Sequence, residues 1–385
     1  MIDPRYLRSL GVAAVAWVLA YAGLSLVVDP YGISPLSWSF HGINQHKPER
    51  VDIDRQLKPY EVWRYQPVTL FLGTSRIQQS IDPAVLDGSD LAPAYNASIP
   101  ASTLEMNVAH LKEYVRLNPR LRTVIVELFF YNFVGERKPP STPPAADFLK
   151  HTAAMFVSVD TLKATLKTLT KNVLAGCPCQ EIKPGGHFSI PDGHDSRAPF
   201  GGFPAGIWEL HRTRNDFKLT ESAFQAVAEM MEIARENGLT LHFLLTPNHA
   251  YDEHYLDAVG VWGVVETWLQ RLSDMAPLHS FAQPNVWTQE PVSSRMRHWN
   301  DPYHFTVHTG RAMQLALFQG QVEDAPDGFY EQLTRDKISA HIENRKQAVK
   351  LWAAAQPDFV KQFREARVRH GAAVVRLPDS RGTRQ

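Results

Sequence analysis

The segment Pro67-Val-Thr-Leu-Phe-Leu-Gly-Thr-Ser-Arg76 is a short apolar run that ends in glycine and continues into small polar residues. Its length and flanks predict a buried strand that ends at Gly73. Similar runs lie at 94–96 and 123–129, and apolar residues at helical spacing fill 103–117 between them. This alternation of strand and helix predicts an α/β fold with a parallel sheet covered by helices.

The same alternation returns in the second half of the chain. We expect a helix over 220–237, a strand over 239–246, a helix over 253–272, a strand near Val286 and Trp287, and a helix from about Thr309. A Pro-rich stretch, with a helix expected over 147–173, interrupts the rhythm between the two halves. The predicted organisation is therefore an α/β domain made of 61–135 and 218–320, an insertion at 136–217 as a candidate lid, and a helical C-terminal extension with a tail at 321–385.

The N-terminus predicts a membrane anchor. Residues 10–28 form a run of 19 residues without a charge, and at about 1.5 Å per residue such a helix just spans a hydrocarbon layer of about 30 Å. Arg5 and Arg8 precede the run, so residues 1–9 are expected in the cytoplasm. A polar connector, 29–60, would then lead to a main domain in the periplasm or elsewhere outside the cytoplasm. A cleaved signal peptide and a buried core helix are the alternatives.

Composition excludes one class of partner and leaves the cysteines without a clear role. The 385 residues include 40 basic and 40 acidic side chains, so no strongly basic field is available to hold nucleic acid. The chain has two cysteines, Cys177 and Cys179. A zinc site would need more ligands, and a disulfide across one residue is strained, so two free or weakly paired thiols are the expectation.

Three residues far apart in the sequence suggest acyl-transfer chemistry. Ser75 directly follows a predicted buried strand, the place where sites form in open α/β sheets. Asp301 and His304 are three residues apart, so one turn can let the carboxylate orient the imidazole, whose other nitrogen takes the proton from a serine. The structural alternatives are that Ser75 or its neighbour caps the next helix and that Asp301 begins a turn before Pro302.

These residues resemble the motifs of the SGNH (GDSL-like) hydrolase superfamily. Gly73-Thr74-Ser75 is similar to its Gly-Asp-Ser block, and Asp301-x-x-His304 is similar to its C-terminal block. The stretch from Asn96 to Ala101 resembles its Asn-x-x-x-x-Gly block, with Ala in place of Gly. In the third block, Gly-x-Asn, the Gly has no counterpart and the Asn would fall on Tyr131 or Asn132. The resemblance implies a flavodoxin-like three-layer α/β/α domain.

The resemblance also implies an activity and its participants. The predicted anchor and the Gly-Thr-Ser-Arg segment make the chain look like members of the cell-envelope branch of the superfamily. That branch includes proteins similar to the alginate O-acetyltransferase components and the D-alanylation protein of teichoic acids. The expected activity is ester hydrolysis or O-acyl transfer on a glycan or acylated polymer, without a cofactor, beside a membrane-bound acyl-transporting partner at the inner membrane. Backbone N–H groups of Ser75 and Ala101, with Tyr131 or Asn132, are the expected oxyanion donors.

Further alternatives concern Arg76 and the type of protein. Arg76 either binds an anionic group of the substrate or pairs with a carboxylate such as Glu127. A metal-dependent hydrolase could be built on Asp301, His304 and His308. A non-catalytic binding or assembly protein of the same fold is the third class.

Overall fold

The computed structural model describes residues 3–34, 38–135, 148–174, 180–190, 194–197, 203, 206, 217–320 and 322–369. The chain divides into two compact units, which are described separately. The first comprises Met1–Tyr65, Ser141–Pro184 and Phe188–Asp192, and the second comprises Gln66–Pro140, Gly185–His187 and Gly193–Gln385. In this division the predicted connector and much of the predicted insertion fall in one unit. Cys177 and Cys179 lie outside the described residues.

The first unit is built from helices and a short hairpin. Its elements are α1 (Pro4–Val28), η1 (Pro48–Ile53), α2 (Asp54–Tyr65), α5 (Phe148–Phe156), α6 (Val159–Val173), and the antiparallel strands β4 (Glu181–Ile182) and β5 (Phe188–Ser189). A small apolar core joins the segment predicted as a connector to helices α5 and α6. It contains Tyr31, Ile33, Leu57, Tyr60, Met155 and Ala164. The described residues of 29–60 thus pack against helices α5 and α6.

One buried arginine shows how this unit holds the connector in place. Arg50 is almost fully buried and donates from Nη1 to the carbonyl of Tyr31 (2.6 Å) and from Nε to the carbonyl of Ile182 (2.8 Å). It also forms an ion pair with Glu61 at 2.8 Å. These contacts satisfy the guanidinium and tie three chain segments together.

Helix α1 is long and apolar enough to cross a membrane. It begins with Pro4 after the N-cap Asp3 and ends at Val28. The left-handed C-cap Asp29 follows, and its side chain accepts hydrogen bonds from the N–H groups of Ile33 and Ser34. The described part of the chain contains one helix of this kind, and its length agrees with the anchor expected from 10–28.

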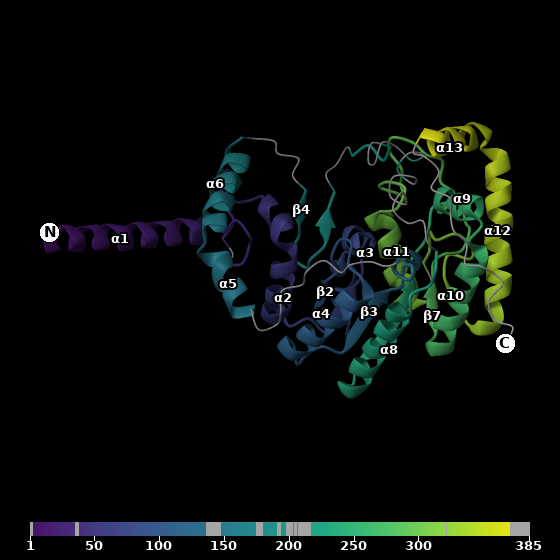
Figure 1. The fold of residues 1–385 in the computed structure, drawn as a ribbon, viewed down its shortest axis with the longest axis horizontal. Helices are drawn as coiled ribbons and strands as arrows, with labels where there is room; N and C mark the ends of the chain where they lie inside the picture. The colour runs from purple at the N-terminus through teal and green to yellow at the C-terminus, as the bar shows by residue number, and fades with distance from the viewer. Residues whose placement is uncertain are drawn as a thin grey trace. The chain divides into compact units, whose positions relative to one another are not determined.

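The second unit contains the central sheet, whose strands are short and mostly parallel (Figure 1). In spatial order the strands are β2 (Ala94–Asn96), β1 (Thr69–Leu72), β3 (Thr123–Glu127), β6 (Thr240–Leu245), β7 (Leu278–Ser280) and β8 (Glu331–Leu333). All neighbours pair in parallel except β7 and β8, which are antiparallel. Every residue of β1 and β3 is buried, as expected for the centre of a parallel sheet.

Helices connect and cover these strands. They are α3 (Ser75–Ser80), η2 (Pro83–Leu86), α4 (Leu104–Leu117), η3 (Phe130–Asn132), α8 (Glu221–Glu236), α9 (Ala250–Val259), α10 (Trp262–Met275), α11 (Val307–Gln319), η6 (Arg335–Lys337), α12 (Ile338–Ala355) and α13 (Pro357–Arg369). Helix α4 packs against α8, α3 against α11, and α12 against α9 and α10. The sheet and its connecting helices therefore agree with the α/β class predicted from sequence.

Three element predictions were wrong in detail. The strand expected near Val286 is a turn, because the Asn285 side chain accepts hydrogen bonds from the N–H groups of Trp287 and Thr288; the strand lies instead at Leu278–Ser280. The helix expected over 253–272 is two helices, α9 and α10, separated by Gly260 at φ 73°. The helix expected over 147–173 is also two, because the Ser158 side chain caps the start of α6.

The contact between α3 and α11 depends on a glycine. Gly310, in the first turn of α11, lies so close to α3 that an added Cβ would overlap the carbonyl of Ser80. The Ser80 hydroxyl in turn donates to the carbonyl of Phe305, just before α11. These two contacts bring the segment that follows Ser75 against the segment that follows His304.

We therefore predict that Gly310→Ala lowers the stability of the full chain by about 1–3 kcal/mol, because the methyl group must push the two helices apart. The measurement is the unfolding transition in detergent micelles. Gly263→Ala is the matched control, since Gly263 also lies early in a helix but has open space around it. Unchanged stability of Gly310→Ala would show that the two helices do not need this close approach.

Candidate active site

The turn that carries Ser75 is fixed where β1 ends. Gly73 allows the chain to approach Glu127, because a Cβ at this position would meet the Glu127 side chain at 2.9 Å and Ile77 at 2.7 Å. Thr74 is the N-cap of α3, and its hydroxyl accepts a hydrogen bond from the N–H of Arg76 (3.3 Å). Ser75 begins α3 and is partly exposed. Thr74 thus has the capping role, while the Ser75 hydroxyl remains available for chemistry.

The loop that carries Asp301 and His304 is closed on itself. Trp299 and Phe305 form an antiparallel bridge, and the N–H of Asn300 donates to the carbonyl of His304 at 2.7 Å. Inside the loop, Asp301 Oδ1 accepts hydrogen bonds from the N–H groups of Tyr303 (2.8 Å) and His304 (3.0 Å). The turn that this sequence suggested is therefore present, and it also orients the carboxylate.

The two segments meet to form a continuous series of hydrogen bonds. Asp301 Oδ2 lies 2.6 Å from His304 Nδ1, and His304 Nε2 lies 2.8 Å from Ser75 Oγ. Both Asp301 and His304 are buried. An acceptor at Nδ1 favours the tautomer with hydrogen on that nitrogen, which leaves Nε2 free to accept the serine proton. The structure brings together all three residues that the sequence named.

The charge state of Asp301 suits this arrangement. Burial by itself raises the pKa of Asp301, but the charge and hydrogen bond of His304, with the two backbone N–H groups, outweigh that effect. The pKa therefore lies below the ordinary aspartate value, which favours the ionised carboxylate.

Arg76 is buried beside the nucleophile and contacts protein groups. Its Nε lies 3.3 Å from Glu127 Oε1, and its Nη2 donates to the carbonyl of Pro247 and to Asn248 Oδ1. The guanidinium also lies over the ring of Phe129 at 4.4 Å. Of the two roles expected for Arg76, this placement supports pairing with Glu127. A contact with substrate would require these interactions to open.

Glu127 is the acceptor for the whole nucleophile turn. Its Oε2 accepts from both the N–H and the hydroxyl of Thr74, each at 2.8 Å, and its Oε1 accepts from the hydroxyl of Thr246 at 3.1 Å. Thr246 directly follows β6, so sequence reasoning could have found it by asking which polar residue ends each parallel strand. The Thr in Gly73-Thr74-Ser75 therefore matches Glu127, because an aspartate at 74 would place two carboxylates together.

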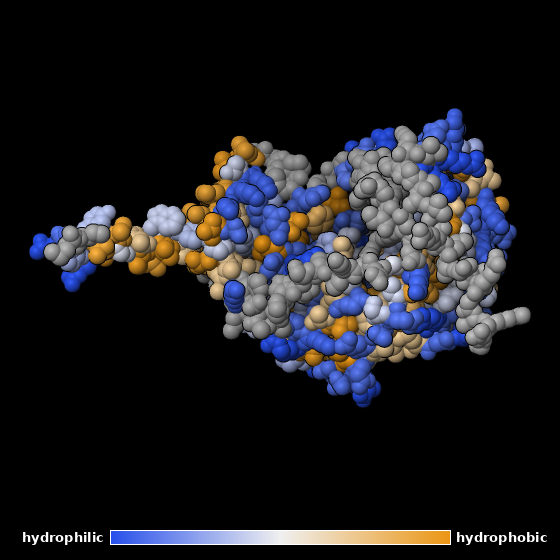
Figure 2. Space-filling model, viewed as in Figure 1, coloured by the Kyte–Doolittle hydropathy of each residue, from blue (hydrophilic) through white to orange (hydrophobic). Residues whose placement is uncertain are grey.

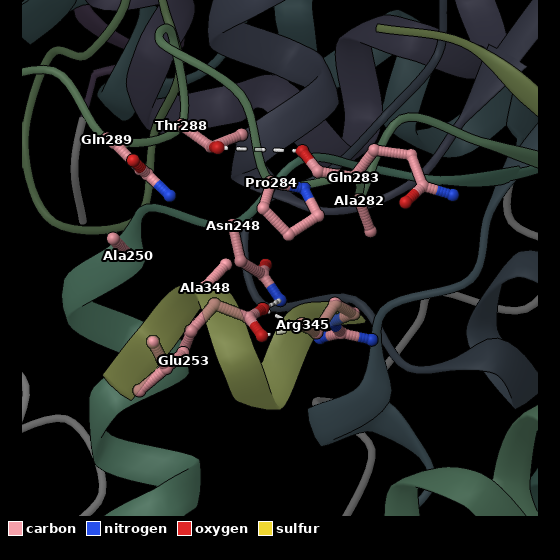
Figure 3. Close-up of a pocket in the computed structure, with 11 residues that line it drawn as sticks. Asn248, Ala250, Glu253, Ala282, Gln283, Pro284, Thr288, Gln289, Arg345 and Ala348 are labelled. Atoms are coloured by element: carbon pink, nitrogen blue, oxygen red, sulfur yellow. Dashed lines mark hydrogen bonds and ion pairs between the residues drawn. The ribbon is translucent and has the colours of Figure 1, made fainter. Parts of the chain in front are cut away.

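A second series of polar contacts leads from Arg76 to helix α12. Asn248, which accepts from Arg76, donates to Glu253 Oε1 at 3.1 Å, and Glu253 forms a buried ion pair with Arg345 at 2.6 Å (Figure 3). A cavity of about 10 Å³ lies among these side chains, room for about one water molecule. None of the triad residues lines this cavity, so it is a feature of the supporting network.

The second predicted block lies beside the nucleophile turn. The Asn96 side chain donates to the carbonyls of Ile77 (2.9 Å) and Ile81 (2.8 Å) and so holds the end of α3. The carbonyl of Gly73 accepts from the N–H of Ile99 and the hydroxyl of Ser102, which fixes the loop on both sides of Ala101. Ala101 is exposed and has φ 56°, a conformation that glycine adopts more easily.

The third predicted block offers a different geometry. Tyr131 is fully buried, and its hydroxyl donates to Asp252 Oδ1 at 2.9 Å. Burial and the neighbouring Asp252 raise the pKa of Tyr131, so this hydroxyl stays protonated and engaged. Asn132 ends η3 and is also buried. The placement therefore supports a structural role for the Tyr131 hydroxyl, while an oxyanion role for Asn132 stays a prediction.

The metal alternative gains no support from the geometry. His308 lies against Trp287 and His298, with ring centroids 5.3 and 5.2 Å apart. Within the described ranges, no group of three or more His, Cys, Asp or Glu side chains is placed to hold a metal ion.

The Arg76–Glu127 pair gives a direct test of the supporting network. We predict that Arg76→Met lowers stability by about 3–5 kcal/mol, because it leaves a buried carboxylate without its cation. Combining it with Glu127→Gln should cost less than the sum of the two single changes, as measured by a double-mutant cycle. Lys112→Ala, which breaks an exposed pair with Glu229, is the control and should cost under about 1 kcal/mol. Additive effects at 76 and 127 would contradict the pairing.

His249 makes the site loop sensitive to acid. It is fully buried against Trp299; its Nδ1 accepts from the N–H of Tyr251 and its Nε2 donates to the carbonyl of Glu290. Protonation would turn Nδ1 into a donor facing another donor. Burial lowers the pKa of His249 to about 4.

Because the folded-state pKa lies below the ordinary value near 6.5, the unfolded chain takes up the proton first as the pH falls. We therefore predict that stability falls between pH 6.5 and pH 4, by up to about 3 kcal/mol from this residue. His249→Asn keeps a capping oxygen but does not titrate in this range. Unfolding midpoints at several pH values should show a shallower dependence in the variant, and parallel curves would refute the assignment.

Comparison with family models, with curated proteins and with solved structures finds no match to this chain. The geometry of Ser75, His304 and Asp301 is therefore the ground for a functional assignment.

Proposed function

We propose that this chain is a serine enzyme of acyl-ester chemistry, either an ester hydrolase or an O-acyltransferase. One observation carries the proposal: Ser75, His304 and Asp301 form a hydrogen-bonded series with distances of 2.8 and 2.6 Å. Asp301 and His304 share one turn, but Ser75 lies 229 residues from His304, so the fold and not local sequence brings the serine to the imidazole. The partly exposed serine at one end and the buried carboxylate at the other have the order that nucleophilic catalysis requires.

The reaction proceeds through a covalent intermediate. His304 Nε2 takes the Ser75 proton as Oγ attacks the ester carbonyl carbon and the carbonyl π electrons move to oxygen. The tetrahedral intermediate collapses and breaks the bond to the alcohol, which leaves with the proton from His304. An acceptor then enters, loses its proton to His304 and attacks the carbonyl carbon of the acyl-serine. The bond between that carbon and Ser75 Oγ breaks, and Oγ takes the proton back from His304. Water as acceptor gives an acid, and a sugar hydroxyl gives a new ester.

Backbone N–H groups supply the oxyanion site in this proposal. Ser75 is the first residue of α3, where N–H groups have no partner within the helix. The left-handed conformation of Ala101, on a loop fixed to Gly73, supports the Ala101 N–H as the second donor. Such donors stabilise the developing negative charge more than the ground-state carbonyl.

The strand order supports a flavodoxin-like arrangement. Numbered along the chain, the first five strands of the sheet lie in the order 2-1-3-4-5, with the edge strand β8 added. This is a common order of doubly wound sheets, and right-handed crossovers would put helices on both faces. Ser75 follows the carboxyl end of β1, and Asp301 and His304 lie in the loop before α11. This placement supports a site at the carboxyl edge of the sheet.

The substrate and the location complete the proposal. An apolar N-terminal helix and the resemblance to envelope enzymes support a single-pass protein of the inner membrane that acts outside the cytoplasm on a polysaccharide or related polymer. As a transferase it would need acyl groups delivered across the membrane, hence a membrane-bound acyl-transporting partner.

The test is labelling of the full chain in detergent with a serine-directed fluorophosphonate, together with hydrolysis of an activated acetate ester. We predict that Ser75→Ala abolishes labelling and that Asp301→Asn lowers hydrolysis by about 10³–10⁴-fold, because the imidazole loses its orienting acceptor. Ser89→Ala, at an exposed serine, is the control and should behave as the unchanged chain. Neither labelling nor hydrolysis by the unchanged chain would refute the proposal.

A further inference from the structure

Helix α6 has the reverse of the usual amphipathic pattern. The side of the helix that packs into the first unit carries Thr161, Ala164, Thr165, Thr168 and Asn172. An apolar stripe faces outward, with exposed fractions of 70% for Val159, 53% for Leu166 and 67% for Val173. A helix on the surface of a water-soluble domain buries its apolar side instead. The outward stripe therefore calls for an apolar environment.

The lysines of α6 lie on a different side from its apolar stripe. Lys163, Lys167 and Lys171 follow each other at intervals of four, and the last two form ion pairs with Glu49 at 3.2 and 2.9 Å. Helices that lie at a bilayer surface have this combination of an apolar stripe and a basic side. The exposed Val157, at the bend between α5 and α6, extends the apolar surface beyond α6.

Contacts with α1 show where along that helix the bend between α5 and α6 lies. The Tyr21 hydroxyl is hydrogen-bonded to the backbone of Ser158, and Ser25 Oγ lies 3.2 Å from Thr165 Oγ1. Tyr21 precedes the end of α1 at Val28 by seven residues, or about 10 Å along the helix. The bend at Ser158 is thus level with a point about 10 Å inside the apolar run.

The uncovered part of α1 is too short to cross a bilayer alone. Residues 4–20 are exposed throughout, but their apolar portion, 10–20, is only about 16 Å long. A hydrocarbon layer of about 30 Å requires the apolar run up to Val28. The part of α1 that α5 and α6 cover must then lie within the membrane, and the covering helices lie there with it.

From these observations we propose that the α5–α6 bend and the apolar stripe of α6 are embedded in the outer leaflet of the bilayer that α1 crosses. The bound partner is phospholipid, whose acyl chains contact Val157, Val159 and Leu166. Figure 2 shows apolar residues continuing from α1 onto this side of the first unit. The depth of about 10 Å agrees with that of helices at the boundary between headgroups and acyl chains. The proposal is independent of the chemistry at Ser75.

The test uses nitroxide labels on the full chain in vesicles of phosphatidylethanolamine and phosphatidylglycerol. Labels are placed by Val159→Cys or Leu166→Cys, after Cys177→Ser and Cys179→Ser. Leu351→Cys is the matched control, because Leu351 is an exposed leucine on α12 of the second unit, with an exposed fraction between those of Leu166 and Val159. Relaxation by oxygen, which concentrates in lipid, is compared with relaxation by a water-soluble nickel chelate.

We expect the oxygen-to-nickel ratio at 159 and 166 to exceed that at 351 several-fold. Ratios equal to the control would place the stripe in water and overturn the proposal. Protection from both reagents would show a protein partner in place of lipid and would also overturn it. Release of the full chain from vesicles by alkaline carbonate would refute the membrane anchor together with this proposal, while fluorophosphonate labelling of Ser75 reports separately on the proposed enzyme activity.

Discussion

The buried carboxylate of Glu127 at the end of β3 is the interaction on which the candidate site depends. It accepts hydrogen bonds from the N–H and hydroxyl of Thr74 and from Thr246, and it faces the charge of Arg76. A buried carboxylate destabilises the fold unless such partners pair with it. Moving any of these partners away from Glu127 would therefore cost free energy, and this cost fixes their positions. Thr74 immediately precedes Ser75, and the position of the nucleophile thus follows from this one charge.

Two consequences extend from Glu127 in opposite directions. Toward the site, it accounts for the threonine at position 74, because an aspartate there would place a second carboxylate beside Glu127. Away from the site, Arg76 donates a hydrogen bond to Asn248, Asn248 donates to Glu253, and Glu253 forms an ion pair with Arg345 on α12. The C-terminal extension is therefore joined to the nucleophile turn through buried polar groups, although it contributes no residue to the triad.

Sequence predicted the elements whose pattern is local. The strands β1, β3 and β6 and the helices α4 and α8 were expected because apolar runs and helical spacing specify them. Leu278–Ser280 lacks such a run and is a strand only because β6 and β8 pair with it. Similarly, Ser75, Asp301 and His304 were recognised by residue type and spacing, whereas Thr246 and Asp252 are single polar residues whose partners are known only once the strands are assembled.

The hydrogen bonds of Asp301 distinguish a purely structural role in its turn from a role in orienting the His304 imidazole. A turn needs only one acceptor, and Asp301 Oδ1 supplies it to the N–H groups of Tyr303 and His304. Asparagine or serine would do the same without burying a charge. The second oxygen adds nothing to the turn and instead contacts His304, whose other nitrogen meets Ser75. The cost of burying a carboxylate is therefore explained by orienting the imidazole, which favours the catalytic interpretation over the structural one.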